Sequence, residues 1–171
     1  MVVIKYILIF STITVFTVIG NLYSKKYLSR LNELERIDSI LNIFKAKIKF
    51  TCLTIQEIFE QIYLENKDNI GEIFKFASDY MNEQSSQAAW EKALENAKDK
   101  TNLNEEDIVT LKTLGKMLGN TDIAGQVSQI ELTEQMLIGR IENAKIERQK
   151  NAKLYRTLGV TTGLTIAIIL I

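Results

Sequence analysis

The chain has 171 residues, which is room for one domain with a modest hydrophobic core. Its 21 basic and 21 acidic residues balance, and it contains no histidine, no proline and one cysteine. Because it lacks histidine, the commonest general base, and any cysteine cluster for zinc, we predict no catalytic residue, no metal site and no cofactor.

The N-terminal segment, residues 1–24, is predicted to be a transmembrane anchor. Residues 2–23 contain a single charge, Lys5, and as a helix they span about 33 Å, enough for a hydrocarbon core of about 30 Å. A cleaved signal peptide is the alternative, but no small-residue cleavage site follows, and Lys25 and Lys26 come directly after the apolar run. More basic residues follow this segment than precede it, so the next domain is expected in the cytosol.

Residues 25–156 are predicted to form a helical bundle domain. Its first helix follows from apolar residues at three- and four-residue steps: Leu28, Leu31, Leu34, Ile37, Leu41, Phe44 and Ile48. Four capping signals begin the next helices, namely Thr54 with Glu57, Asn69 with Glu72, Ser85 or Ser86, and Asn104. The lone Cys52 is expected to be buried rather than reactive.

Charge is unevenly distributed along this domain. Residues 54–110 contain 13 acidic and five basic residues, a net charge of −8, which disfavours nucleic-acid binding. The segments beside the apolar ends are basic instead, and we interpret them as membrane flanks. The flanking candidates are Lys25, Lys26, Arg30, Lys150, Lys153 and Arg156.

The last predicted helix carries an apolar stripe from Ile123 to Ala144, and nothing up to Leu158 forces a break. It is expected to continue into residues 157–171, a C-terminal transmembrane segment of about 22 Å that is shorter than the hydrocarbon core and relies on a neighbour. Gly159 and Gly163 permit close packing, with residues 2–23 as the expected partner. The fold class is therefore all-α, an antiparallel bundle of about six helices between two transmembrane segments.

Three motifs give the chain a family resemblance. They are Ala89-Trp90; Leu118-Gly119-x-x-Asp122 followed by Gln126 and Ile130-Glu131; and the closing Asn151-x-Lys153-Leu154-Tyr155-Arg156-x-Leu158-Gly159-Val160, with Gly163 and an aliphatic end. With these motifs and its N-terminal anchor, the chain resembles the stage III sporulation protein AB family over essentially its whole length. Ala152 departs from the acidic residue that the family commonly has.

The resemblance implies a function that the residues alone do not. The family belongs to the channel-like complex between mother cell and forespore, and its cytosolic domain is similar to the six-helix domain of the type II secretion platform protein. It implies docking to the ATPase stage III sporulation protein AA, contact with other channel components and no activity of its own. It also implies a location in the outer forespore membrane, facing the mother-cell cytoplasm.

The residues themselves suggest roles for four motif positions. Trp90 is expected to be a core anchor with its indole N–H bonded to backbone, or else part of a binding surface. Gly119 suits a left-handed turn, while Asp122 and Gln126 either fix the turn before the last helix or contact a partner. Two other functions stay open: a self-associating membrane scaffold, hence a homo-oligomer, and an enzyme at the membrane surface.

Overall fold

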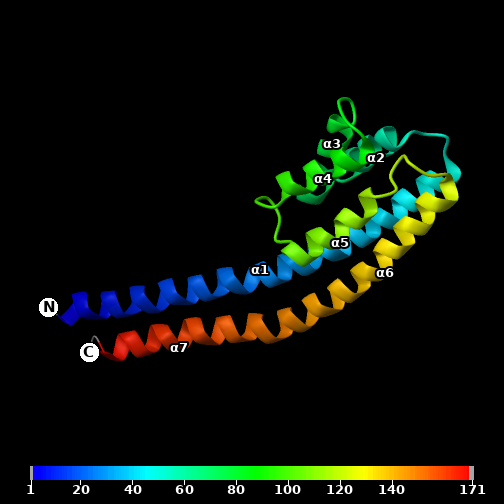
Figure 1. Cartoon of the computed structure of the whole chain (residues 1–171). Helices are drawn as coiled ribbons and strands as arrows, with labels where there is room; N and C mark the ends of the chain where they lie inside the picture. Colours follow the sequence, from blue (N-terminus) through cyan, green and yellow to red (C-terminus); the bar gives the residue numbers. More distant parts are fainter. Residues whose placement is uncertain (1, 170–171) are drawn as a thin grey trace. The chain divides into compact units, whose positions relative to one another are not determined.

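The computed structural model describes the backbone of residues 2–169. It does not describe the side chains of residues 2–9, 12, 13, 152, 156, 164 and 167–169. Its elements are α1 (Val2–Phe50), α2 (Ile55–Glu65), α3 (Asn69–Tyr80), α4 (Ser86–Ala97), α5 (Glu105–Gly115), α6 (Ile123–Glu147), the π-helix η1 (Arg148–Ala152) and α7 (Lys153–Ile169). The described backbone is all-helical, as predicted (Figure 1). It forms two compact units: unit 1 (Met1–Leu31 with Asn143–Ile171) and unit 2 (Asn32–Glu142).

Side-chain caps decide where the short helices of unit 2 begin. Thr54 and Asn104 complete capping boxes with the third residue of α2 and α5, as the spacing predicts, and Ser85 caps α4. The predicted cap of α3 is wrong by one residue. Asp68 rather than Asn69 accepts a hydrogen bond from Gly71 N, because Asn69 already has helical geometry.

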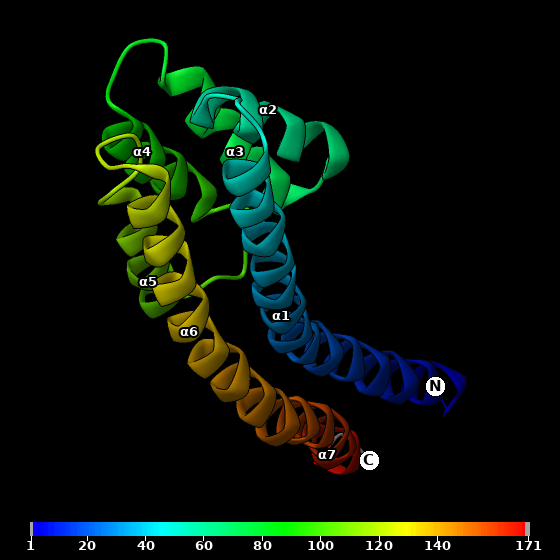
Figure 2. The same cartoon turned by 90° about the vertical axis from the view of Figure 1, so that its right-hand side faces the viewer.

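An aromatic cluster with side chains from α1, α2, α3 and α4 forms the core of unit 2. Figure 2 shows the short helices α2, α3 and α4 gathered beside the C-terminal part of α1 in this unit. The Phe59 ring lies 5.0 Å from Phe44, 5.1 Å from Phe74 and 5.6 Å from Trp90, between ring centroids. All four side chains are buried. Stacked and edge-on aromatic pairs add to the free energy of burying their apolar area, so this cluster holds the helices of unit 2 together.

Polar side chains join the later helices of unit 2. Gln129 of α6 donates a 2.6 Å hydrogen bond to the Thr113 carbonyl of α5, and Arg140 of α6 forms an ion pair with Glu106. Lys45 of α1 forms a 2.5 Å ion pair with Glu134 of α6. These contacts close the bundle between its first and last helices.

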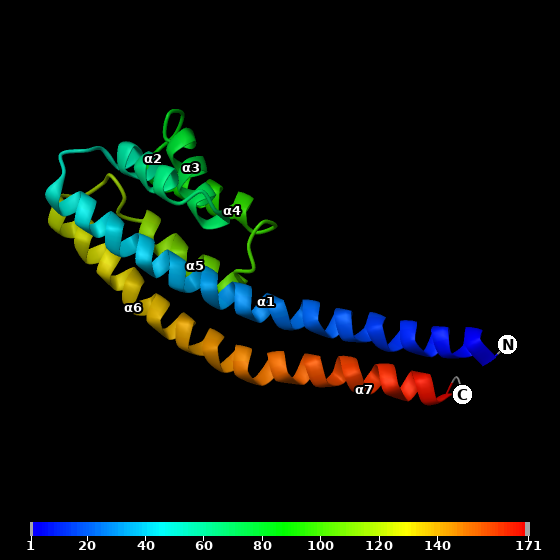
Figure 3. The same cartoon turned by 180° about the vertical axis from the view of Figure 1, so that it is seen from behind.

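Unit 1 pairs the beginning of α1 with α7, which run antiparallel and side by side (Figures 1 and 3). A Cβ atom on Gly20 would lie 2.6 Å from the Tyr155 carbonyl oxygen, and one on Gly159 would lie 2.7 Å from that of Phe16. The two backbones therefore touch where neither helix has a side chain. This confirms the predicted packing of Gly159 against residues 2–23; Gly163 is also buried.

The chain reaches α7 through a single π-helical segment, which the uninterrupted apolar stripe does not predict. Residues Arg148–Ala152 form η1 between two α-helices. A π-helix widens the turn because its backbone bonds run from i to i+5, and it rotates the following residues relative to an α-helical path. The chain stays helical, but the side chains of α7 point in different directions from those that an uninterrupted α-helix would give them.

Two further expectations differ from the structure. Cys52 is exposed, because residues 51–54 form a non-helical connection between α1 and α2 rather than part of a packed helix. Among the residues that the structure describes, no helix combines the length and the apolar composition needed to cross a membrane. The predicted transmembrane segments 1–24 and 157–171 are thus unsupported by the structure, and residues 1 and 170–171 lie outside the described backbone.

Candidate functional site

The described side chains do not offer a catalytic constellation. In that part of the chain, no group of three His, Cys, Asp or Glu residues is placed to hold a metal ion. Hydrogen bonds from Thr54 hold the pKa of Glu57 below its usual value, and bonds from Lys112 and Lys98 do the same for Glu95. Both shifts favour the charged form, whereas a general acid needs a raised pKa. The surfaces described below are considered as binding sites.

Three predicted motif residues meet at the turn before α6. Gly119 has a φ of 74°, a left-handed conformation that glycine adopts without strain. Asp122 Oδ1 accepts a 2.8 Å hydrogen bond from Gly125 N and so caps α6. Gln126 Nε2 donates to the Thr121 carbonyl at 3.1 Å. Asp122 and Gln126 thus each bond to the turn, and all three residues shape its backbone.

A shallow groove of about 750 Å³ lies beside this turn. It is lined by Lys49, Asp122, Ile123, Ala124, Val127, Ser128 and Glu131. Its mixed charges and apolar floor select no particular ligand chemistry. The motif residues of the turn contribute one side chain to it, that of Asp122.

Trp90 is not part of this turn. It is 1% exposed, and its indole N–H donates a 2.8 Å hydrogen bond to the Leu111 carbonyl of α5. Sequence reasoning missed the residue that makes room for it. A Cβ on Gly115 would lie 2.8 Å from Trp90 Cδ1. The only signal in the sequence is a glycine at the end of an apolar helix, which carries no information about a ring packed on it.

The six predicted membrane-flank basic residues separate into different environments. Arg30 is 6% exposed and pairs with Glu147 at 2.6 Å, so its guanidinium contributes to packing within unit 1. Lys26 and Lys150 are exposed, and the side chain of Arg156 lies outside the described residues. Lys25 and Lys153 line one groove together.

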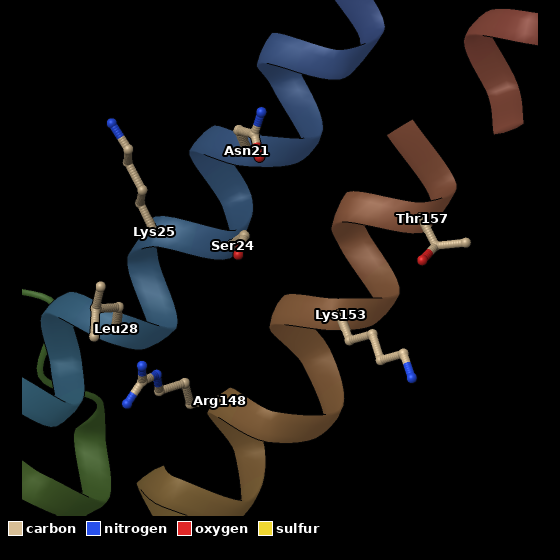
Figure 4. Close-up of a pocket in the computed structure, with 7 residues that line it drawn as sticks. All are labelled: Asn21, Ser24, Lys25, Leu28, Arg148, Lys153 and Thr157. Atoms are coloured by element: carbon tan, nitrogen blue, oxygen red, sulfur yellow. The ribbon is translucent and has the colours of Figure 1, made fainter. Parts of the chain in front are cut away.

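This basic groove, as we call it, has a volume of about 840 Å³ (Figure 4). It is lined by Asn21, Ser24, Lys25 and Leu28 of α1 and by Arg148, Lys153 and Thr157 of η1 and α7. Arg148 was not among the predicted site residues, because its position on the groove depends on the π-helical turn. The groove lies entirely within unit 1.

The acidic surface of unit 2 is partly neutralised by ion pairs. Glu95 pairs with both Lys98 and Lys112, and Glu72 pairs with Lys100. Exposed acids outside these pairs remain: Glu60, Glu83 and Asp99 form no ion pair within the described part of the chain. The negative net charge of residues 54–110 is therefore displayed at fewer positions than the count of acids indicates.

Comparison with known proteins identifies the family of this chain. The profile of the family described as stage III sporulation protein AB matches residues 5–171. Stage III sporulation protein AB of Bacillus subtilis (strain 168) is 26% identical over 149 residues, which cover 86% of this chain and 87% of the relative. A solved structure of a stage III sporulation protein AB, 22% identical, superposes with a TM-score of 0.66 over 71% of this chain and 98% of its own, and it shows the same fold. Because the family match extends over nearly the whole sequence, the chain belongs to the stage III sporulation protein AB family.

Proposed function

We propose that this protein is a non-enzymatic platform component of the sporulation complex between mother cell and forespore, and that unit 2 docks a cytosolic ATPase, stage III sporulation protein AA. Family membership supports the role in a sporulation complex. The observation that carries the docking proposal is a set of three exposed acids of residues 54–110 that form neither an ion pair nor a helix-capping bond among the described residues: Glu60, Glu83 and Asp99. Such charges steer and orient a basic partner.

The proposal includes attachment to the outer forespore membrane through residues 1–24 and 157–171, with unit 2 facing the mother-cell cytoplasm. Its support is the apolar composition of both segments, together with the contact of Gly20 and Gly159 that pairs them within unit 1. Alkaline extraction of membranes from sporulating cells tests this part. The chain is expected to stay with the lipid, and release into the soluble fraction would contradict attachment.

The docking test uses the full chain in a neutral detergent and the purified ATPase. The charge-reversal variant Glu60→Lys/Glu83→Lys/Asp99→Lys is expected to weaken co-sedimentation with the ATPase at least tenfold, since each exposed charge contributes about 0.5–1 kcal/mol. Glu142→Lys, which reverses one exposed acid of α6 outside residues 54–110, is the control for the single variant Glu83→Lys and is expected to bind normally. Unchanged binding by the triple variant would reject docking through these acids.

A self-associating scaffold is the second candidate, and one observation favours it. Leu132, Met136 and Ile138 of α6 are 49%, 38% and 61% exposed, which is apolar area that a second copy could cover. Sedimentation velocity of the full chain in detergent separates the candidates. A monomer that binds the ATPase supports the platform. An oligomer that does not bind the ATPase, and that the substitution Leu132→Glu dissociates, supports the scaffold.

A further inference from the structure

The basic groove of unit 1 has one wall made by a single face of α1. Asn21, Ser24, Lys25 and Leu28 lie at steps of three and four residues, so they share one side of that helix. This wall therefore offers the Ser24 hydroxyl group, the Lys25 ammonium group and the apolar side chain of Leu28. A wall of this kind is suited to a ligand with a charged head and an apolar part.

The opposite wall depends on the π-helical segment. Residues five apart are separated by about 140° around an α-helix, since each residue turns the chain by about 100°. Where backbone bonds run from i to i+5, residues five apart lie about one turn apart instead. The η1 segment therefore brings Arg148 and Lys153 onto the same wall, and Thr157 follows one α-helical turn later. Single π-helical turns are frequent at functional sites.

The charges around the groove all have one sign. Lys25, Arg148 and Lys153 are exposed, and the described lining contains no carboxylate. The nearest acid in sequence, Glu147, is held by Arg30 in a 2.6 Å ion pair. In Figure 4 the Arg148 guanidinium points toward Leu28 between the two helices, while the two lysine side chains extend to either side. An unbalanced positive groove is stabilised by an anion.

We propose that the basic groove binds a phosphate-bearing anion, either the phosphodiester headgroup of an anionic phospholipid or free phosphate. The planar Arg148 guanidinium, which points between the two helices, suits two oxygens of a phosphate at once. The flexible side chains of Lys25 and Lys153 extend outward in Figure 4 and would add point charges on turning toward the anion. The Ser24 and Thr157 hydroxyls supply further donors. This proposal does not rest on ATPase docking: a chain that binds phosphate but not the ATPase leaves it intact.

Binding is tested with the full chain in a neutral detergent, labelled at Cys52, its one cysteine, which is exposed and belongs to unit 2. The label reports titration by microscale thermophoresis with short-chain phosphatidylglycerol, short-chain phosphatidylcholine and sodium phosphate. Phosphatidylglycerol is expected to bind more tightly than zwitterionic phosphatidylcholine. Raising the salt concentration is expected to weaken the binding of phosphatidylglycerol. Equal binding of the two lipids, or no binding of either phosphatidylglycerol or phosphate, would overturn the proposal.

The matched variants locate the site. Lys25→Gln/Lys153→Gln is expected to weaken binding by about twenty-five-fold, at roughly fivefold for each lysine. Lys26→Gln/Lys150→Gln removes the same charge from neighbouring exposed positions outside the groove, and a change below about threefold is expected. Equal losses in both variants would show non-specific charge attraction and reject the groove. Circular dichroism checks that both variants fold.

The phosphate arm separates the two sources of the anion. If inorganic phosphate binds and displaces phosphatidylglycerol, and Arg148→Gln reduces both, the groove recognises phosphate itself. If phosphatidylglycerol binds while phosphate neither binds nor displaces it, the groove recognises the lipid headgroup. Binding that survives Arg148→Gln unchanged would remove the guanidinium from the site and contradict the proposed geometry.

Discussion

At the residue scale, two helical glycines of unit 2 have opposite surroundings. A Cβ on Gly115 would lie 2.8 Å from Trp90 Cδ1, within a buried and rigid ring system, while a Cβ on Gly139 would have no heavy atom within 4 Å. Glycine at position 115 is thus required by packing. At position 139 it only lowers the stability of the helix, because it adds conformational freedom to the unfolded chain.

The two alanine substitutions are expected to change stability in opposite directions. Gly115→Ala should lower the free energy of unfolding of unit 2 by about 1–3 kcal/mol through overpacking. Gly139→Ala should raise it by about 0.5–1 kcal/mol. Urea unfolding followed by the fluorescence of Trp90, the only tryptophan, measures both. A stabilising Gly115→Ala would show that the Trp90 ring has room to move.

The ionisation of Tyr27 makes the stability of unit 1 depend on pH. Its ring stacks on Tyr155, and burial, followed by a hydrogen bond with Tyr155 and the charges of Tyr155 and Glu147, raises its pKa. A pKa that is higher in the folded state means that this stabilisation is complete below the ordinary tyrosine pKa of about 10 and is lost as pH rises through the folded value.

The expected result is a tyrosine that ionises later than the others in a spectrophotometric titration of the folded chain. Tyr155→Phe removes the hydrogen bond and the second ionisable group but keeps the burial, so it should lower the pKa of Tyr27 only part of the way toward its ordinary value. Tyr80→Phe, a change in unit 2, is the control and should leave the late titration in place. A titration of Tyr27 in Tyr155→Phe that is identical to that of the original chain would contradict the contribution of Tyr155 to the raised pKa.

At the element scale, α1 and α7 are held by a direct backbone contact together with stacked tyrosine side chains. Gly20 and Gly159 meet directly, and Tyr155 stacks against both Tyr23 and Tyr27, at 5.6 and 5.9 Å between ring centroids. Close backbone approach maximises van der Waals contact between helices and depends on both glycines. The three tyrosines report on whether that approach is intact.

Gly159→Leu is therefore expected to separate α1 from α7. The added side chain would occupy the position of the α1 backbone, 2.7 Å from the Phe16 carbonyl oxygen, so the helices must move apart. Loss of the tyrosine bands in near-ultraviolet circular dichroism measures the change. Val160→Leu, at an exposed neighbouring position, is the control and should preserve the spectrum. A normal spectrum for Gly159→Leu would refute the close contact.

At the scale of the whole molecule, the ion pair between Lys45 and Glu134 joins the first and last helices of unit 2. The Glu134 side chain is 12% exposed, and its Oε1 atom has no hydrogen-bond partner among the described residues. The ion pair with Lys45 therefore offsets most of the free-energy cost of burying the Glu134 carboxylate. Removing the lysine alone leaves a buried charge, whereas removing both groups leaves an apolar contact.

Lys45→Met is accordingly expected to lower the free energy of unfolding of unit 2 by about 2–3 kcal/mol. Lys45→Met/Glu134→Leu should recover most of that loss, because two apolar side chains replace the pair at similar volume. Urea unfolding of the single and double variants forms the cycle. Equal losses in both would show that the pair is more favourable than the apolar contact that replaces it.

Local signals were sufficient for most helices of this chain, although not for the π-helical segment Arg148–Ala152. Thr54 and Asn104 cap α2 and α5 as predicted, because a cap involves residues three apart and the sequence displays them directly. The error at the start of α3 has a local cause as well, because the adjacent residues Asp68 and Asn69 can both cap a helix. Only the backbone conformation decides between them. The all-α class and the left-handed Gly119 were predictable for the same reason.

Contacts between distant residues were decided by the tertiary structure. Arg30 looks like one more flanking cation in the sequence, yet it pairs with Glu147, which is 117 residues away. The basic groove likewise needs the π-helical turn to bring Arg148 and Lys153 together opposite Lys25. The sequence by itself determined which segments are helical, because helix formation depends on near neighbours. Which charges, glycines and rings meet depended on packing, since that requires the position of every other helix in the same unit.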